Sequence, residues 1–249
     1  MVGKNKLRFP SFLYKPLKAI AQEKTLEEDS VMKQKKQFLA KVICFVVSCA
    51  CLTFFPPAAY SFDCGSGSTK VLVAYDTKYN ATADIAALIG LVLCAQGFDV
   101  TVLKADDKSL SDISTYDAVI LGSPIYYGSW LPAAQAFLKK HEQTLATMPV
   151  AYFISSNLLR EGYASPEKEA KALQYYVQPV LDQYPAIKPL EPIGNFGGKV
   201  EFSDFTAFEW IIMKAFGYYD NDSRDWNKIA QWAQQISMLL TMPAEQLLQ

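Results

Sequence analysis

Histidine is nearly absent from this chain, with one residue, His141, among 249. A single imidazole makes a Ser-His-Asp or Cys-His catalytic arrangement untenable, and we expect His141 to be a solvated residue near a helix end. The five cysteines include no C-x-x-C pair, so no metal site is predicted. Neither G-x-x-x-x-G-K nor G-x-G-x-x-G occurs, which excludes a P-loop and the usual dinucleotide-binding fingerprint.

Charge is scarce overall but unevenly distributed along the chain. Residues 1–61 carry ten basic and four acidic side chains, a net charge of +6. Residues 62–249 carry fourteen basic and twenty-one acidic side chains, a net charge of −7. Because an acidic globular part is repelled by phosphate backbones, we expect no nucleic-acid partner.

Residues 1–61 are predicted to form an N-terminal extension around an uncharged apolar run at 42–55. Lysines precede the run and Ala59-Tyr60-Ser61 follows it, which is typical of a secretory signal with a small-x-small cleavage site. Such a signal would have an ordinary length if translation began at Met32. The true start is therefore open between Met1 and Met32.

The same apolar run has other interpretations. It fits an uncleaved membrane anchor, with its basic flank on the cytoplasmic side, and Val46-Val47-Ser48-Cys49 resembles a lipoprotein box. In these cases, as with a cleaved signal, we expect the following domain on the extracytoplasmic side. A cytoplasmic, membrane-associated protein is the alternative.

From residue 70 onward, apolar runs alternate with helical periodicity. The predicted strands are 70–75, 98–103, 118–121, 150–155 and one within 189–200. The predicted helices are 82–96, 130–145, 166–181 and 225–240. This alternation predicts an α/β fold with a doubly wound, five-stranded parallel sheet over residues 70–240. Residues 62–69 are expected to be a linker, and residues 241–249 a C-terminal tail.

Three polar loops follow the first, third and fourth strands of this pattern, at one edge of the predicted sheet, where ligands bind in open α/β folds. The phosphate loop (residues 76–82) runs into a helix, whose N–H groups and flanking hydroxyls suit a phosphate; Thr82 could equally be a helix cap. The ring loop (residues 122–128) offers two adjacent tyrosines for stacking on a flat ring. The third loop covers residues 155–157.

The region from about 70 to 240 resembles the flavodoxin family. The resemblance is carried by Tyr75–Thr82 and by Leu121–Gly128, although Asp76 stands where that family has Ser or Thr, and Asn80 where it has Gly. It implies strand order 2-1-3-4-5 and an FMN cofactor. The residues expected to hold FMN are Asp76, Thr77, Lys78, Asn80, Ala81, Thr82, Ser123, Pro124, Ile125, Tyr126, Tyr127, Gly128, Ser155, Ser156 and Asn157.

A narrower resemblance connects the chain to the menaquinone-dependent protoporphyrinogen IX dehydrogenase family. It is carried by the order and spacing of several segments: Phe137–His141, Met148-Pro149, Phe196–Lys199, Ile211–Lys214 and Arg224–Trp226. It implies an oxidoreductase that passes electrons from a tetrapyrrole or similar donor to a quinone. The expected partner is therefore a redox partner or a quinone, and membrane association is a further expectation.

Two alternatives remain open, a flavodoxin-type electron-transfer module without its own substrate and a domain that binds partners without FMN. The aromatic segment (residues 202–219) bears on this choice. It is interpreted either as a helix packed on the sheet or as a surface that meets a membrane or a quinone.

Overall fold

The structure, a computed structural model, describes residues 61–157, 165–215 and 217–242. Nearly all of the expected extension at 1–61, including the apolar run at 42–55 and Met32, lies outside the described residues, as does most of the tail at 241–249. Within the described ranges, no helix is both long enough and apolar enough to cross a bilayer.

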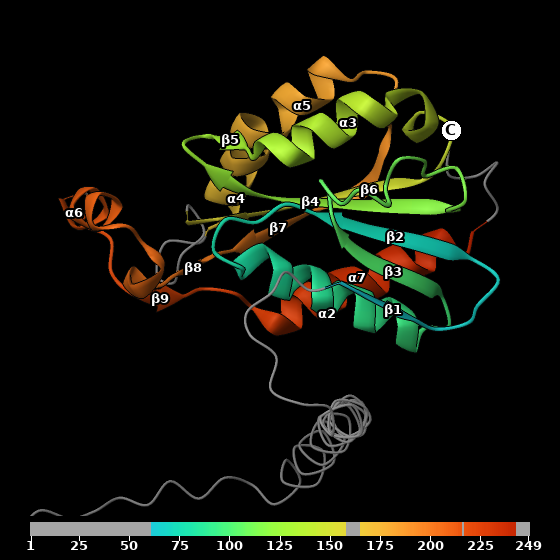
Figure 1. Cartoon of the computed structure of the whole chain (residues 1–249), viewed down its shortest axis with the longest axis horizontal. Coiled ribbons are helices and arrows are strands. Elements are labelled where there is room, and N and C mark those ends of the chain that lie inside the picture. The colour runs from blue at the N-terminus through green and yellow to red at the C-terminus, as the bar shows by residue number, and fades with distance from the viewer. Residues whose placement is uncertain (1–60, 158–164, 216, 243–249) are drawn as a thin grey trace, which may run out of the picture. The chain divides into compact units, whose positions relative to one another are not determined.

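A mostly parallel sheet forms the centre of the described domain (Figure 1). Its strand order is β1-β3-β2-β4-β6-β7, and β5 pairs with the end of β4. The strands are β1 (Phe62–Cys64), β2 (Lys70–Tyr75), β3 (Asp99–Lys104), β4 (Ala118–Tyr126), β5 (Ser129–Trp130), β6 (Val150–Ser156) and β7 (Pro189–Gly197). The parallel strands β3-β2-β4-β6-β7 have the predicted order 2-1-3-4-5, so the predicted fold class is confirmed.

Two details differ from the prediction. Phe62–Cys64, expected at the start of a linker, instead pairs antiparallel with β3 as an edge strand, and its Phe62 and Cys64 pack against the hydrophobic core. Strand β4 continues five residues beyond the predicted strand and forms a hairpin with β5. The ring loop is therefore mostly extended strand, with its turn at Tyr127 and Gly128, where φ is +48° and +81°.

Helices cover both faces of the sheet (Figure 1). One face carries α2 (Ala81–Ala95) and α7 (Trp226–Leu240), and the other carries α3 (Pro132–Leu145) and a continuous helical stretch. This stretch consists of α4 (Pro166–Ala172), a π-helical turn at Leu173–Val177 and α5 (Gln178–Gln183). Alternate residues of β2 serve the two faces, Val71 and Val73 one and Leu72 and Ala74 the other, as strand geometry requires.

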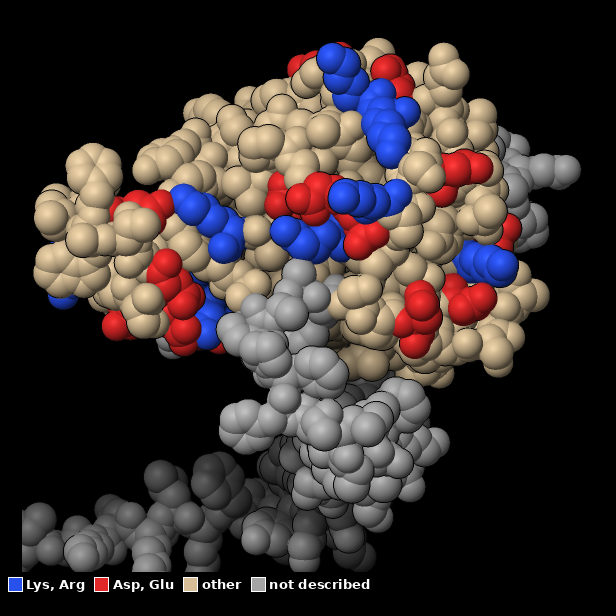
Figure 2. Space-filling view, in the orientation of Figure 1, with Lys and Arg blue, Asp and Glu red and all other residues tan. Residues whose placement is uncertain are grey.

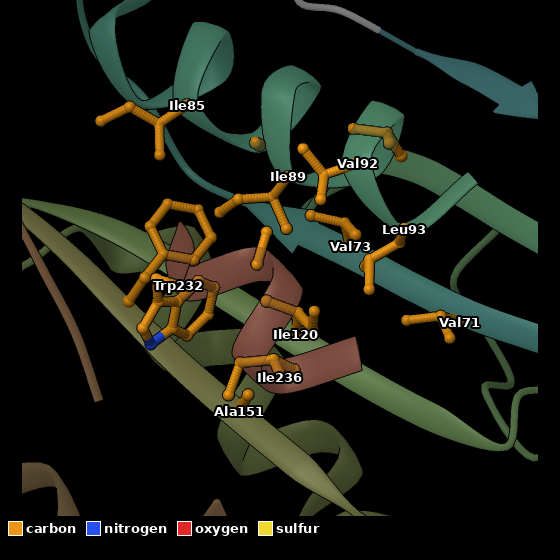
Figure 3. Close-up of a cluster of buried hydrophobic side chains, with 14 of the residues drawn as sticks. Val71, Val73, Ile85, Ile89, Val92, Leu93, Ile120, Ala151, Trp232 and Ile236 are labelled. Atoms are coloured by element: carbon orange, nitrogen blue, oxygen red, sulfur yellow. The ribbon is translucent and has the colours of Figure 1, made fainter. Parts of the chain in front are cut away.

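The core under α2 and α7 holds the larger aromatic cluster (Figure 3). The indole of Trp232 packs edge-on against Phe153 and Phe196, with ring centroids 6.1 and 5.7 Å apart. Gly122 on β4 lies against this cluster, because a Cβ there would come within 1.9 Å of the Phe153 ring. Its missing side chain is therefore a packing requirement.

The prediction that His141 is a solvated residue is wrong. It lies on α3 and is 6% exposed, and its Nε2 is 3.1 Å from the carbonyl oxygen of Leu110. Burial lowers the pKa of His141, and the nearby charge of Lys140 lowers it further. The residue near a helix end is thus a hydrogen-bonded part of the interior rather than a solvated group.

After β7 the chain leaves the sheet and forms a projection. Short strands β8 (Lys199–Val200) and β9 (Asn221–Asp222) pair antiparallel at its base. Between them lie a 3-10 turn at Phe202–Asp204 and helix α6 (Ala207–Ala215). Figure 1 shows α6 beyond the end of the sheet, and no residue of α6 is buried. The aromatic segment therefore does not pack on the sheet.

Candidate functional site

A cavity of about 440 Å³ lies at the carboxyl ends of β2, β4 and β6. The parallel register places Tyr75 beside Gly122, and Pro124 beside Ser155, which brings the three loops together. Twelve of the fifteen predicted site residues line this cavity: Thr77, Lys78, Ala81, Thr82, Pro124, Ile125, Tyr126, Tyr127, Gly128, Ser155, Ser156 and Asn157. Asp76, Asn80 and Ser123 do not.

Asp76 faces away from the cavity. Its carboxylate is buried, and Oδ2 accepts hydrogen bonds from the backbone N–H groups of Ala133 and Ala134 at 2.9 and 3.3 Å. Its Oδ1 accepts a third from the N–H of Thr77 at 2.8 Å. The negative charge therefore lies at the positive N-terminal end of α3, where the helix dipole favours it. A phosphate at the other side of the loop does not face this carboxylate.

Ser123 and Asn80 also stabilise the backbone of the loops and do not line the cavity. Ser123 is fully buried, and its hydroxyl accepts from the N–H of Leu131 at 2.9 Å and donates to the carbonyl of Pro124 at 3.0 Å. Asn80 has φ of +59°, in the left-handed region that Gly and Asn tolerate best, and directly precedes α2. Both residues shape the site without lining the cavity.

The polar end of the cavity is formed by the phosphate loop and the third loop. Thr82 Oγ1 and Ser155 Oγ lie 2.9 Å apart and join the two loops through a buried hydrogen bond. The first turn of α2 starts here, and the N–H groups of a first helical turn have no partner within the helix. Hydroxyls and helix N–H groups together form a cradle suited to a phosphate.

Ser156 is an unusual member of this end. It is 4% exposed, and its Oγ is buried without a hydrogen-bond partner among the described residues. An unpaired buried hydroxyl costs free energy, so a ligand group in the cavity that bonds to it is favoured. Gly198 lies next to this loop, where a Cβ would come within 3.2 Å of the Asn157 side chain.

The aromatic end of the cavity is formed by the ring loop. Tyr127 is 81% exposed, and its ring centroid is 4.5 Å from that of Tyr126 in an edge-on arrangement. An exposed ring held on a tight turn offers a flat face for stacking. This is the flat surface that the sequence predicted at residues 122–128.

The aromatic segment supplies an outer wall that the sequence analysis did not place at the site. Phe205, Glu209, Ile212, Met213 and Tyr218 line the cavity. Other residues missed by the sequence analysis are Tyr79, Tyr176, Gly198, Lys199 and Val200. The aromatic composition of 202–219 was the available signal, but it gave no indication of which surface the segment would approach.

A cluster of polar side chains joins this wall to the loops. Glu209 Oε1 accepts hydrogen bonds from Lys78 Nζ at 2.6 Å, Tyr79 OH at 2.9 Å and Tyr126 OH at 3.0 Å. The hydrogen bond from Lys78 holds the pKa of Glu209 well below its usual range, with support from Thr206. Partial burial alone would lower the pKa of Lys78, but its bonds to Glu209 and Tyr126 raise it. Both groups are charged at neutral pH.

The residues present fit FMN. The cradle at Thr77, Thr82 and α2 suits its phosphate, the unpaired hydroxyl of Ser156 suits a polar group of the ligand, and Tyr127 suits its ring. The cavity volume of about 440 Å³ lies within the range of cofactor sites. Among the described residues, no group of three or more His, Cys, Asp and Glu side chains could hold a metal ion.

The chain matches a flavodoxin family model and is similar to two proteins named protoporphyrinogen IX dehydrogenase [quinone]. A family model described as a flavodoxin domain matches residues 72–225. The chain is 27% identical over 186 residues to protoporphyrinogen IX dehydrogenase [quinone] of Escherichia coli K12, covering 70% of this chain and 98% of the relative. A protein of the same name from Leishmania major is 26% identical over 188 residues, covering 70% of this chain and 77% of that protein.

Solved structures that match include flavodoxins. Oxidised Flavodoxin 2 from Bacillus cereus gives a TM-score of 0.46 at 20% identity, and a flavodoxin from the domain Archaea gives 0.45 at 15%. Each match covers 70% of this chain and 100% of the solved chain.

Proposed function

The chain belongs to the flavodoxin domain family, and we propose that it is a quinone-linked oxidoreductase that takes electrons from a tetrapyrrole or similar donor. FMN binding and oxidoreductase chemistry follow at the level of the family. The donor and the quinone are the proposed part, supported by the similarity to protoporphyrinogen IX dehydrogenases at 26–27% identity.

One observation carries the proposal: the cavity combines a hydroxyl and N–H cradle at one end with an aromatic and apolar wall at the other. Bound FMN would supply the redox chemistry by accepting and releasing electrons. Thr77 and Thr82 would hold its phosphate through hydrogen bonds, Ser156 would orient it, and Tyr127 would cover one face of its ring. Ile212 and Met213 would keep water from the apolar end.

The aromatic segment distinguishes this function from a second candidate, an electron-transfer module without its own substrate. A carrier needs only an exposed cofactor edge and a complementary surface for its partner, and the acidic balance of residues 62–249 is compatible with that role. It has no evident need for an apolar outer wall, which favours a small apolar reactant. A domain without FMN is the third candidate.

A visible spectrum of the purified full chain is the first test. We expect flavin absorbance, either as isolated or after incubation with FMN. If no flavin binds under either condition, both redox functions are wrong and the third candidate remains. With FMN bound, anaerobic oxidation of protoporphyrinogen with a menaquinone analogue as acceptor supports the enzyme, whereas electron exchange with carrier proteins alone supports the module.

The placement of the flavin ring is tested separately by Tyr127→Ala. We expect FMN affinity to fall roughly 3-fold to 10-fold, because a stacked aromatic pair contributes about 0.5–1.5 kcal/mol beyond its buried area. Tyr175→Ala is the matched control, since Tyr175 is 64% exposed and does not line the cavity. Equal affinity in the two variants would refute stacking on Tyr127.

We also propose that the extension at 1–61 directs the domain to the extracytoplasmic side, either as a cleaved signal or as a membrane anchor. The proposal is supported by the basic flank, the apolar run at 42–55 and the small residues Ala59 and Ser61. N-terminal sequencing of the mature protein, combined with cell fractionation, tests it. A mature chain that keeps residues 1–61 and stays accessible only from the cytoplasm would overturn it.

A further inference from the structure

Helix α6 lies at the cavity although it does not pack on the sheet. It buries none of its residues, yet Glu209, Ile212 and Met213 on it line the cavity. Most helices are held in place by an apolar face packed against the body of the protein. Without such packing, α6 must be held at the cavity by specific side-chain contacts. Figure 1 shows how far it stands from the helices that cover the sheet.

The carboxylate of Glu209 makes most of these contacts. Its Oε1 accepts from Lys78 and Tyr79 of the phosphate loop and from Tyr126 of the ring loop, at 2.6, 2.9 and 3.0 Å. Its Oε2 accepts from the N–H and hydroxyl of Thr206, at 3.0 and 2.9 Å, which fixes the start of α6. One side chain therefore connects α6 to both loops of the proposed cofactor site.

An aromatic contact accompanies this carboxylate. The rings of Tyr79 and Phe205 meet edge-on with centroids 4.9 Å apart, and Phe205 in turn packs against Phe202 at 5.7 Å. Beyond these rings the outer part of the projection is exposed, with Phe208 and Ile211 being 72% and 59% accessible. Figure 2 shows a mostly uncharged surface at that outer end. The attachment is thus narrow and concentrated near Glu209.

The contact between α6 and the phosphate loop includes an ion pair between Glu209 and Lys78. The Glu209 side chain is 18% exposed and that of Lys78 is 35% exposed, so the ion pair is partly shielded from water. Lys78 also lies over the Tyr126 ring, with Nζ 3.9 Å from the centroid. Removal of the carboxylate would leave the ammonium and two tyrosine hydroxyls without their shared acceptor and would release α6 from both loops at once.

We propose that Glu209 is a positioning residue that fastens the aromatic segment across the mouth of the FMN cavity and thereby slows the entry of water and the release of the cofactor. The inference rests on the proposed function for its consequence on FMN, but the fastening itself is a property of the chain alone. In this role Glu209 acts through its hydrogen bonds with Lys78, Tyr79 and Tyr126.

The fastening is tested first on the full chain without FMN, by hydrogen–deuterium exchange of peptides covering α6. We expect Glu209→Ala to raise the exchange rate about 10-fold, because several charge-assisted hydrogen bonds are lost together. Glu209→Gln keeps a carbonyl acceptor and should recover part of the protection. Asp204→Asn, in the same segment and outside the cavity lining, is the matched control and should leave exchange unchanged. Equal exchange in Glu209→Ala and the wild type would overturn the proposal.

The consequence for the cofactor is measured with FMN bound. In Glu209→Ala we expect FMN to dissociate about 10-fold faster, seen as recovery of free-flavin fluorescence after dilution, and the visible bands to shift toward those of FMN in water. Glu209→Gln should again be intermediate. If no variant binds FMN, the proposed function fails while the exchange experiment still decides the fastening. If α6 loosens but the dissociation rate and spectrum are unchanged, the role in retaining FMN is wrong.

Discussion

Helices α6 and α7 look alike in sequence, and the structure uses them in opposite ways. Both combine tryptophan with aliphatic residues at helical spacing. Helix α7 buries Ile229, Trp232, Ala233 and Ile236 against the sheet and α2, whereas α6 buries nothing. In Figure 3 Trp232 and Ile236 of α7 lie among side chains of α2 and of strands β2, β4 and β6. An apolar stripe therefore contributes to stability in one helix and to the wall of a cavity in the other.

The contrast between α6 and α7 indicates that folding stability and cofactor binding depend on different parts of this protein. Residues that face the sheet should control the free energy of unfolding and leave the cofactor alone. Residues of the projection and the cavity should control FMN binding and leave the free energy of unfolding nearly unchanged. Matched pairs of substitutions, one in the core and one at the projection or cavity, test this division.

Trp232 on α7 and Trp210 on α6 should give the largest contrast. Trp232 is 6% exposed and its Nε1 donates to the carbonyl of Pro192 at 2.7 Å, so Trp232→Ala should cost about 3–5 kcal/mol of unfolding free energy. Trp210 on α6 is 44% exposed, and Trp210→Ala should cost less than about 1 kcal/mol. Urea denaturation of both variants measures the difference. Similar losses would show that the projection is part of the folded core.

The next largest contrast in unfolding free energy should be between two carboxylates, Asp76 in the phosphate loop and Glu209, which contacts this loop from α6. Asp76 accepts from two N–H groups at the start of α3 and from the N–H of Thr77, so Asp76→Ala should cost about 2 kcal/mol of unfolding free energy, while Asp76→Asn, which keeps an acceptor, should cost less. Glu209→Gln should leave the unfolding free energy nearly unchanged, because α6 is not buried. FMN titration of the folded Asp76→Asn variant should give near wild-type affinity. A large gain in affinity would mean that the Asp76 charge acts on the phosphate after all.

A smaller contrast should separate Ser123, which supports the fold, from Ser156, which is available to the cofactor. Ser123→Ala leaves the partly buried N–H of Leu131 without its acceptor and should cost about 1–3 kcal/mol of unfolding free energy. Ser156→Ala removes a hydroxyl that has no partner among the described residues, so the apoprotein should lose almost no stability. Its FMN affinity should fall by a factor of about 3–10, the value of one hydrogen bond. Calorimetric titration with FMN and urea denaturation of both variants separate the two roles.

The smallest effect on unfolding free energy should come from His141, a buried residue of α3. Its pKa is lowered by burial, so between pH 6.5 and its folded pKa the unfolded chain binds a proton that the folded chain does not. Its contribution to stability is therefore present above pH 6.5 and is lost as the pH falls. Because it is the one histidine of the chain, His141→Gln should flatten the decline in unfolding free energy between pH 7.5 and 5.5. An identical decline in both proteins would contradict this assignment.

Much of the fold and most of the site could be predicted from local patterns. Periods of two and of 3.6 residues mark the strands and helices, and parallel strands bring their carboxyl ends to one edge. That rule alone brings Thr82, Tyr127 and Ser156 to one cavity. The antiparallel pairing of Phe62–Cys64 was not predictable, because a three-residue strand has too little pattern to distinguish it from a linker.

Side-chain direction was decided by the tertiary structure. Asp76 and Ser123 lie in the predicted loops but turn inward, because α3 begins beside them and its N–H groups need acceptors. Asn80 contributes a left-handed backbone conformation rather than a contact in the cavity. A motif defines the positions in a loop, whereas the neighbouring helix determines which of its side chains remain available to a ligand.

The order of strands and helices along the chain and the three loops follow from periodicity and from residues close together in the chain, whereas FMN was expected from the resemblance of two of these loops to the flavodoxin family. Only the tertiary structure decided that α6 stands at the cavity and that Glu209 meets Lys78 and Tyr126, which are 131 and 83 residues away. Contacts over such separations depend on how the whole sheet places its loops, and no local pattern encodes them.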